Sequence, residues 1–334
     1  MKKKFKVGVI GLGVGERHLE AYIKFGCDVK KIYDINNDKM LKIKKKYPKI
    51  EISKSEDDLI NDEEIEIVSI ASYDNNHYQQ IVKCIKNKKN IFVEKPVVLS
   101  EVHAKNVNKL LIKNKNVFFY CNFILSESPV FKKIKSDIKK NRYGKLFKID
   151  ADYNYGRIKK ITEGWRSKIP FYSVTLGGGI HLVDLLNWIS NSRVKEVKSF
   201  ANKICTYKTN FKYNDCVISL LKYENNMIAK ISSNFGCVYP HFHKLTIYGT
   251  KKTFENDIKH IRIFEERESK RIKEFNNDYK NYFKGNAIKV FLDSIGNYKT
   301  RKILIKRVFE SLMICFGIEK SIKTHKNVKI NYFS

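Results

Sequence analysis

The chain has 334 residues, 43% of them hydrophobic, which is enough for two globular domains with a large core. Its 66 lysine and arginine residues against 35 aspartate and glutamate residues give a net charge of +31. No stretch approaches the roughly 20 consecutive apolar residues of a membrane span, and the basic start is not followed by the apolar core of a signal peptide. We therefore expect a cytoplasmic protein without a membrane partner.

The positive charge suits nucleic-acid binding, but its distribution favours another explanation. Lysines are spread along the whole chain, isoleucine, asparagine and tyrosine are abundant, and neither an arginine-rich tract nor a nucleic-acid-binding motif is present. This composition is typical of a genome rich in A and T, so we expect no nucleic-acid partner. The positive field would still attract an anionic small-molecule substrate, such as a nucleotide sugar.

The seven cysteines are an odd number and contain no C-x-x-C pair. They therefore predict neither a disulfide framework nor a zinc site, and we expect no bound metal. Several lie inside apolar runs, where a thiol packs as a small hydrophobic group.

The first 34 residues have the order strand, glycine-rich turn, helix, strand, acidic residue. The glycines allow a tight turn and let a phosphate approach the backbone at the start of a helix, whose free N–H groups attract an anion. Asp34, at the end of the second strand, is placed to accept hydrogen bonds from a ribose diol, and its charge would repel a 2′-phosphate, so NAD is expected rather than NADP. Glu16 stands where the usual fingerprint has its third glycine. The turn consists of Gly11, Leu12, Gly13, Val14 and Gly15.

The rest of the first half repeats strand and helix with short links, which predicts a doubly wound parallel sheet. Ligands in such a fold bind beyond the carboxyl ends of the strands, where Ser72 and the segment 94–96 fall. Asn36 and Ser100 are the expected helix N-caps. Strands are expected over 5–10, 29–33, 50–53, 65–71, 90–93 and 117–123, and helices over 16–22, 37–46, 56–60, 75–88 and 101–115.

The second half has the alternating pattern of antiparallel strands, with a hairpin turn expected at Asn225-Asn226. One helix is strongly indicated after a run of three glycines, and two more come late. We expect an α+β domain with one broad sheet. Its strands are expected over 145–155, 194–206, 216–223, 227–234, 244–248 and 261–265, and its helices over 181–189, 282–295 and 301–320.

Two groups of residues could carry chemistry. Lys95, between Glu94 and Pro96 at a strand end, could polarise a substrate hydroxyl or carbonyl beside a nicotinamide. His181 follows the three glycines at the start of an otherwise apolar helix and could exchange the proton that accompanies hydride transfer. Asp184, one turn later on the same face, is better suited to orienting neighbouring groups.

These features together resemble the Gfo/Idh/MocA family of NAD(P)-dependent oxidoreductases, the family of glucose–fructose oxidoreductase and inositol dehydrogenase. Each motif is weak alone, but their joint spacing is specific and covers essentially the whole chain. The matching residues are Gly11-Leu12-Gly13 with Gly15 and His18, Ser72 to His77, Glu94-Lys95-Pro96, Asn122, Ser128 to Phe131, Gly164-Trp165-Arg166, and Gly177-Gly178-Gly179 with His181, Asp184 and Trp188.

The resemblance implies an NAD-binding Rossmann domain over residues 1–122. Residues 123–334 would form an α/β domain with a large, mostly antiparallel sheet, which binds the substrate and forms a homodimer or homotetramer through its outer face. Hydride would pass between nicotinamide and a sugar, polyol or nucleotide-linked sugar, and a role in surface-polysaccharide or sugar-nucleotide biosynthesis would suit the last. Lys95 and His181 would be catalytic and, with Asp184, would contact the substrate. Besides the glycine turn and Asp34, the cofactor would meet Ser72, His77, Glu94, Lys95, Asn122, Trp165 and Arg166.

One departure from the family pattern bears on activity. Many members carry an aspartate four residues before the histidine, and this chain has Gly177 there. Proton transfer would then fall to His181 and Lys95, with a tyrosine such as Tyr153, Tyr155 or Tyr172. The alternative hypothesis is a regulator of the same fold that binds NAD but is catalytically weak or inactive.

Overall fold

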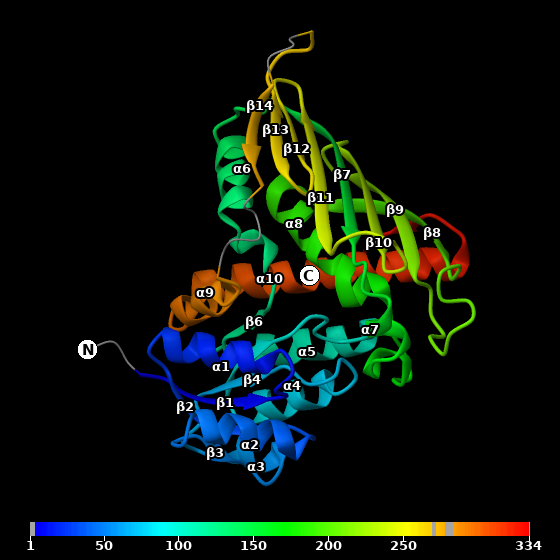
Figure 1. The fold of residues 1–334 in the computed structure, drawn as a ribbon. Helices are drawn as coiled ribbons and strands as arrows, with labels where there is room; N and C mark the ends of the chain where they lie inside the picture. Colours follow the sequence, from blue (N-terminus) through cyan, green and yellow to red (C-terminus); the bar gives the residue numbers. More distant parts are fainter. Residues whose placement is uncertain (1–3, 269–271, 278–282, 334) are drawn as a thin grey trace. The chain divides into compact units, whose positions relative to one another are not determined.

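A computed structural model describes residues 4–268, 272–277 and 283–333, which form two compact units (Figure 1). The first unit comprises Met1–Ile124 together with Phe283–Phe309. The second comprises Leu125–Tyr282 together with Glu310–Ser334. The expected fold class, a doubly wound parallel sheet followed by an α+β domain with one broad sheet, is confirmed.

In the described part of the first unit, six strands form a wholly parallel sheet in the order β3-β2-β1-β4-β5-β6. The chain moves outward from β1 in both directions, so the carboxyl ends of β1 and β4 are neighbours at the point where the order reverses, which is where dinucleotides bind. The strands are β1 (Lys6–Ile10), β2 (Asp28–Tyr33), β3 (Glu51–Ile52), β4 (Ile67–Ile70), β5 (Asn90–Val93) and β6 (Phe119–Cys121). Between them lie α1 (Gly15–Lys24), α2 (Asn37–Lys46), α3 (Glu56–Asn61), α4 (His77–Lys86) and α5 (Glu101–Lys113).

Local sequence explains these elements directly. Strand β4 is buried at every position, as its unbroken apolar run predicts for a strand covered on both faces. The Asn36 side chain accepts the N–H of Lys39 at 3.2 Å at the start of α2, and Ser100 Oγ accepts the N–H of His103 at 3.2 Å at the start of α5. Both predicted N-caps are confirmed.

The first unit also includes chain that the sequence assigned to the second domain. Helix α9 (Asn286–Ser294) packs Phe291 on Phe92, with ring centroids 5.7 Å apart, and α10 (Tyr298–Thr324) packs Phe309 on Phe119 at 6.3 Å. An amphipathic pattern shows that a helix has an apolar face but does not say which core that face covers. Tyr282, the first residue expected in α9, lies outside the described residues.

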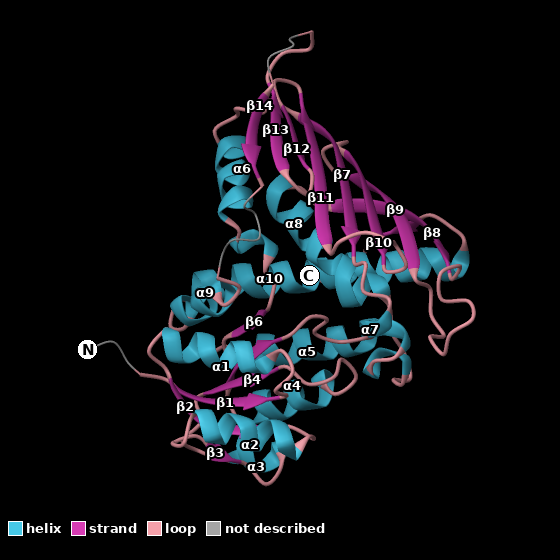
Figure 2. Ribbon diagram, viewed as in Figure 1, coloured by secondary structure: helices cyan, strands magenta, loops and turns pink. Residues whose placement is uncertain are grey.

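In the described part of the second unit, nine strands form one sheet in the order β14-β13-β12-β11-β7-β10-β9-β8-β15 (Figure 2). The pair β7 and β10 is parallel and the other pairs are antiparallel, so the expected large, mostly antiparallel sheet is confirmed. The strands are β7 (Leu146–Asn154), β8 (Val194–Asn202), β9 (Cys216–Tyr223), β10 (Ile228–Asn234), β11 (Phe242–Gly249), β12 (Thr253–Asn256), β13 (His260–Phe264), β14 (Lys273–Asn276) and β15 (Val328–Lys329).

The predicted hairpin turn at Asn225-Asn226 is confirmed. Asn226 has a φ of 65°, which asparagine tolerates better than most residues, and the N–H of Tyr223 donates to the carbonyl of Met227. Strands β12, β14 and β15 were not expected, because they are too short to show a clear alternating pattern. The helices of this unit are α6 (Pro129–Lys139), α7 (Lys159–Thr162), α8 (Ile180–Ser190) and the second part of α10.

Among the residues that the structure describes, no helix is both long enough and apolar enough to cross a membrane.

Truncating Phe291 to alanine should destabilise the protein, because this fully buried ring packs against Phe92 in the core of the first unit. We expect a loss of about 3–5 kcal/mol in the free energy of unfolding, measured in urea. Phe275→Ala is the matched control, since that ring is 53% exposed, and it should change the free energy by less than about 0.5 kcal/mol. Equal effects of the two variants would contradict the assignment of α9 to this core.

Candidate active site

The glycine turn after β1 is tied to the acidic residue at the end of β2. Gly11 has a φ of +84°, and a Cβ there would lie 2.5 Å from the carbonyl carbon of Ala71, so a side chain is excluded. The N–H of Leu12 donates to Asp34 Oδ2 at 2.5 Å, and the N–H of Asn36 donates to Asp34 Oδ1 at 2.8 Å. The buried Asp34 carboxylate is therefore held at the turn, and its contact with a ribose stays a prediction.

The other two glycines explain the departure from the usual fingerprint. The space around a Cβ on Gly13 is open, which leaves room for a ligand to approach the backbone. A Cβ on Gly15 would lie 3.1 Å from Val9 Cγ1 and 3.2 Å from Ala71 Cβ. Gly15 therefore supplies the close packing of helix on sheet that a third glycine provides, one position earlier than usual.

A buried carboxylate at the end of β5 joins three elements of the first unit. Glu94 Oε1 accepts a hydrogen bond from Asn122 Nδ2 at 2.6 Å and lies 3.1 Å from His18 Nε2, whose other ring nitrogen is 3.0 Å from Ser69 Oγ. Burial by itself raises the pKa of the Glu94 carboxyl, but the hydrogen bond and charge of His18, together with Lys95 and Asn122, outweigh it and hold that pKa at about 2. Glu94 is therefore ionised at neutral pH.

The loops after β4 and β5 are joined by His77. Its ring is fully buried, with Nδ1 2.8 Å from the carbonyl oxygen of Pro96 and Nε2 3.2 Å from that of Ser72. The Lys95–Pro96 peptide bond is cis, and the N–H of Lys95 donates to Glu94 Oε2 at 3.2 Å. The backbone of Lys95 is thus held by its neighbours while its side chain remains partly exposed.

The first unit therefore brings most of the predicted cofactor residues to one edge of its sheet. The glycine turn, Asp34, Glu94 and Asn122 directly follow the carboxyl ends of β1, β2, β5 and β6, and Ser72 lies two residues after the end of β4. Sequence reasoning missed Ser69, which positions His18, because nothing in a buried strand marks one serine as a partner for a distant helix.

In the second unit, His181 and Asp184 lie in α8, which continues a π-helix over Thr175–Gly179. His181 is 6% exposed and Asp184 is fully buried. The His181 ring meets the ring of His243, from β11, edge to face at 6.2 Å. The His181 ring thus packs against a histidine of the sheet.

Two of the three glycines, Gly177 and Gly178, are needed because aromatic rings lie directly against this helix, while Gly179 faces the side chain of Ser233. A Cβ on Gly178 would lie 2.6 Å from the Cζ of Phe235, and a Cβ on Gly177 would lie 2.6 Å from the Cζ of Tyr172. Real Cβ atoms do not approach this closely, so the backbone packs directly on the rings.

The expected tyrosines differ in their surroundings. Tyr153 lies between two histidines, with its Oη 3.1 Å from His241 Nε2 and its ring 4.6 Å from that of His243, and burial raises the pKa of its phenol. Tyr155 stacks on Phe235 at 4.4 Å. Sequence reasoning missed His241, which precedes β11, and His243, which lies in it, because this stretch has no distinguishing motif.

Tyr172 contacts Trp165 and Arg166, the two residues of this unit that were expected to bind the cofactor. The Arg166 Nε donates to Tyr172 Oη at 3.1 Å, and the Arg166 guanidinium lies 4.6 Å from the ring centre of Trp165. Trp165 and Arg166 therefore belong to one aromatic cluster with Tyr172 in the second unit. Their contact with a cofactor stays a prediction, as does the convergence of Lys95 and His181 on one nicotinamide.

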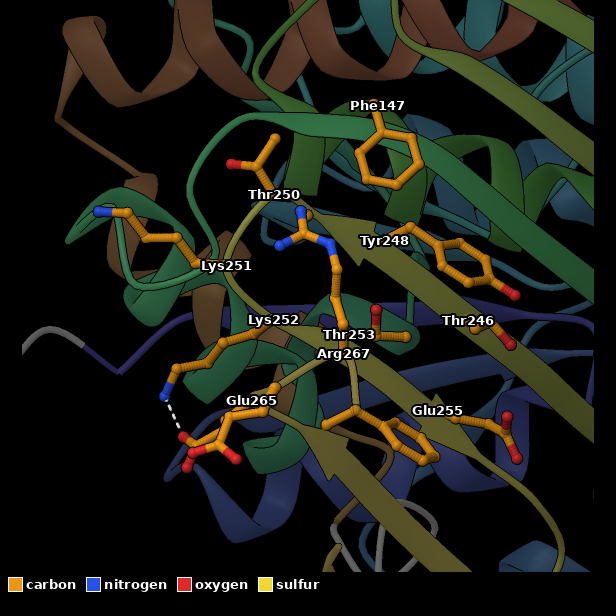
Figure 3. A pocket seen from close by; sticks show the side chains of 13 residues that line it. Phe147, Thr246, Tyr248, Thr250, Lys251, Lys252, Thr253, Glu255, Glu265 and Arg267 are labelled. Atoms are coloured by element: carbon orange, nitrogen blue, oxygen red, sulfur yellow. Dashed lines mark hydrogen bonds and ion pairs between the residues drawn. The ribbon is translucent and has the colours of Figure 1, made fainter. Parts of the chain in front are cut away.

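A hollow of about 650 Å³ lies elsewhere in the second unit, among residues such as Thr246, Tyr248, Lys252 and Glu265 (Figure 3). Thr246 and Tyr248 alternate along β11 with buried core residues, so the hollow is on the sheet face opposite the core and contains none of the predicted site residues. Its rim carries an ion pair between Lys252 and Glu265. Within the described ranges, no group of three histidine, cysteine or acidic residues could hold a metal ion.

The fold and the first unit's site define an oxidoreductase with an NAD-binding Rossmann domain. Comparison with known families agrees. Residues 5–122 match the oxidoreductase family with an NAD-binding Rossmann fold, and residues 131–255 match the GFO/IDH/MocA C-terminal domain. The chain belongs to the Gfo/Idh/MocA family of oxidoreductases.

Individual relatives resemble the chain along its whole length. The myo-inositol 2-dehydrogenase of Thermotoga maritima is 22% identical, over 97% of this chain and 98% of that protein. The structure of myo-inositol 2-dehydrogenase from Lactobacillus plantarum has a TM-score of 0.85 at 15% identity and covers 98% of this chain and 100% of that one. Scyllo-inositol dehydrogenase from Lactobacillus casei, with bound NAD(H) and scyllo-inositol, has a TM-score of 0.81 at 16% identity, over 98% and 99% of the two chains. The two structures are evidence for a shared fold.

Glu94→Gln should destabilise the protein in a pH-dependent way. Because the folded pKa of about 2 lies below the ordinary value of 4.5, the ionised carboxylate contributes stability above about pH 4.5 and loses it as the pH falls toward 2. The shift corresponds to a contribution on the order of 3 kcal/mol near neutral pH. Urea unfolding at a series of pH values measures it, with the partly exposed Glu101→Gln as control. A difference between wild type and Glu94→Gln that is constant from about pH 4.5 to pH 2 would contradict this account.

Proposed function

We propose that the protein is an NAD-dependent dehydrogenase that transfers a hydride between nicotinamide and a CH–OH group of a polyol or sugar. The observation that carries the proposal is the arrangement at the end of β5, where Lys95 follows the buried Glu94 at the same sheet edge as the glycine turn and Asp34. Relatives named inositol dehydrogenases support a polyol as the substrate.

The residues of the first unit fit a dinucleotide. The open space at Gly13 and the start of α1 suit a pyrophosphate, because backbone N–H groups and the helix dipole attract an anion there. Asp34 keeps acceptor capacity for a ribose diol beside its two backbone bonds, since each carboxylate oxygen has a second lone pair. Its negative charge favours NAD over NADP, although Lys39 Nζ lies 3.7 Å from Oδ2.

When bound, NAD⁺ accepts the hydride. Residues of the chain would then remove the proton of the substrate hydroxyl. The Lys95 ammonium can donate to the reacting oxygen and stabilise negative charge on it, and His181 can take the proton as a neutral imidazole. Asp184, one turn along α8, would contact the substrate or orient the groups that do.

The substrate class extends to charged sugars. A net charge of +31 would attract an anionic or nucleotide-linked sugar, as used in surface-polysaccharide synthesis, toward the site. The second domain would bind this substrate and form homodimers or homotetramers through the outer face of its sheet. A screen of NAD⁺ reduction against inositols, sugars and nucleotide sugars tests the class directly.

Lys95→Ala should lower kcat on the substrate found in such a screen by about 10²–10⁴-fold, because it removes the group that stabilises charge on the reacting oxygen. The Kd for NAD, measured by fluorescence, should stay within about twofold of wild type. Lys113→Ala, an exposed lysine of the same unit, is the matched control and should leave both values unchanged. Unchanged turnover in Lys95→Ala would overturn the assignment, and a wild type that binds NAD but oxidises nothing would favour the regulator.

Asp34→Asn should weaken NAD binding by about 10–100-fold, because it removes the negative charge but keeps an acceptor for the Leu12 N–H. The difference in affinity between NAD and NADP should become smaller. Titration of both cofactors measures the ratio of their Kd values. Asp38→Asn, an exposed carboxylate in the next helix, should leave the ratio unchanged. Wild type that binds NADP more tightly would refute the preference for NAD.

A further inference from the structure

The hydroxyl of Tyr172 lies on the helix face that carries His181. Gly177 and His181 are four residues apart in a continuous helical segment, so their side-chain positions share one face. A Cβ on Gly177 would meet the Tyr172 Oη and lie 2.6 Å from Cζ, so the phenol occupies the space that a side chain at 177 would fill. Oη is therefore placed about one helical turn before the imidazole.

This phenol is held rigidly. Tyr172 is 2% exposed, and its ring meets those of Trp165, Phe211 and Phe235 edge to face, with centroids 5.9–6.4 Å apart. A side chain fixed in this way loses little freedom when it binds a ligand, so each hydrogen bond it makes discriminates strongly.

The hydrogen bond from Arg166 sets the direction of the hydroxyl. Because Arg166 Nε donates to Oη at 3.1 Å, the phenol oxygen is an acceptor on that side and its own proton points away from the guanidinium. Tyr153, another buried tyrosine of the cluster, has its oxygen against His241 instead. Of the two, Tyr172 is the one whose oxygen lies against the helix that carries His181.

We propose that Tyr172 Oη binds a substrate hydroxyl on the carbon next to the one that is oxidised at His181, so that the site selects substrates with two adjacent hydroxyls. Cβ positions one turn apart on a helix are about 5–6 Å from each other, and the Tyr172 Oη lies close to the position that a Cβ on Gly177 would take. Two hydroxyls on adjacent carbons can span that gap with one hydrogen bond to each residue. This inference rests on the proposed function, because it needs a polyol or sugar beside His181.

The test combines a variant with a substrate analogue. Tyr172→Phe keeps the ring packing and removes only Oη. It is assayed with the polyol that wild type oxidises best in a panel of inositols and sugars, and with analogues of that polyol that each lack one hydroxyl next to the oxidised carbon. Tyr223→Phe is the matched control, because Tyr223 is a buried tyrosine of the same unit at the far end of β9.

Tyr172→Phe should lower kcat/KM for the parent polyol by about 10–100-fold, the usual effect of removing one partner of a substrate hydrogen bond. For one of the deoxy analogues, wild type and Tyr172→Phe should agree within about twofold, because the partner hydroxyl is already missing. The Kd for NAD should be the same in both proteins, and Tyr223→Phe should match wild type throughout.

An unchanged kcat/KM for the parent polyol, or an equal loss with the parent and every analogue, would overturn the inference and leave the proposed function standing. A wild type that oxidises no member of the panel would instead overturn the proposed function and this inference with it.

Discussion

The buried charge of Glu94 is the interaction on which the candidate site depends most. A carboxylate in the interior is tolerated only when its charge and lone pairs are compensated, and here the partners come from α1, through His18, and from the end of β6, through Asn122. The same carboxylate holds the backbone N–H of Lys95. The Glu94 carboxylate therefore ties together α1, the end of β6 and the backbone of Lys95.

In the second unit, the corresponding constraint is steric. The helix that carries His181 begins with backbone packed directly on aromatic rings, and Gly177 and Gly178 are the positions where a side chain would collide with Tyr172 and Phe235. The glycine run therefore has a packing reason that is independent of any ligand. Because position 177 has no side chain, the phenol of Tyr172 fills the space that such a side chain would occupy.

Features set by local chemistry could be predicted from the sequence: the fully buried β4, the caps Asn36 and Ser100, and the glycine turn with Asp34. Features that depend on distant packing could not. The parallel pairing of β7 with β10 has no local signature, because both strands alternate like antiparallel ones. Tyr172 and Arg166 were expected as separate possibilities, and only packing shows that they share a hydrogen bond on the Gly177 side of the helix.

The return of residues 283–309 to the first unit has a consequence for biosynthesis. Phe92 and Phe119 leave the ribosome well before Phe291 and Phe309, the rings that pack against them. Until then the nascent Rossmann unit displays bare apolar surface, which chaperones recognise and which promotes aggregation. The first 124 residues are consequently a poor choice for expression as an isolated domain.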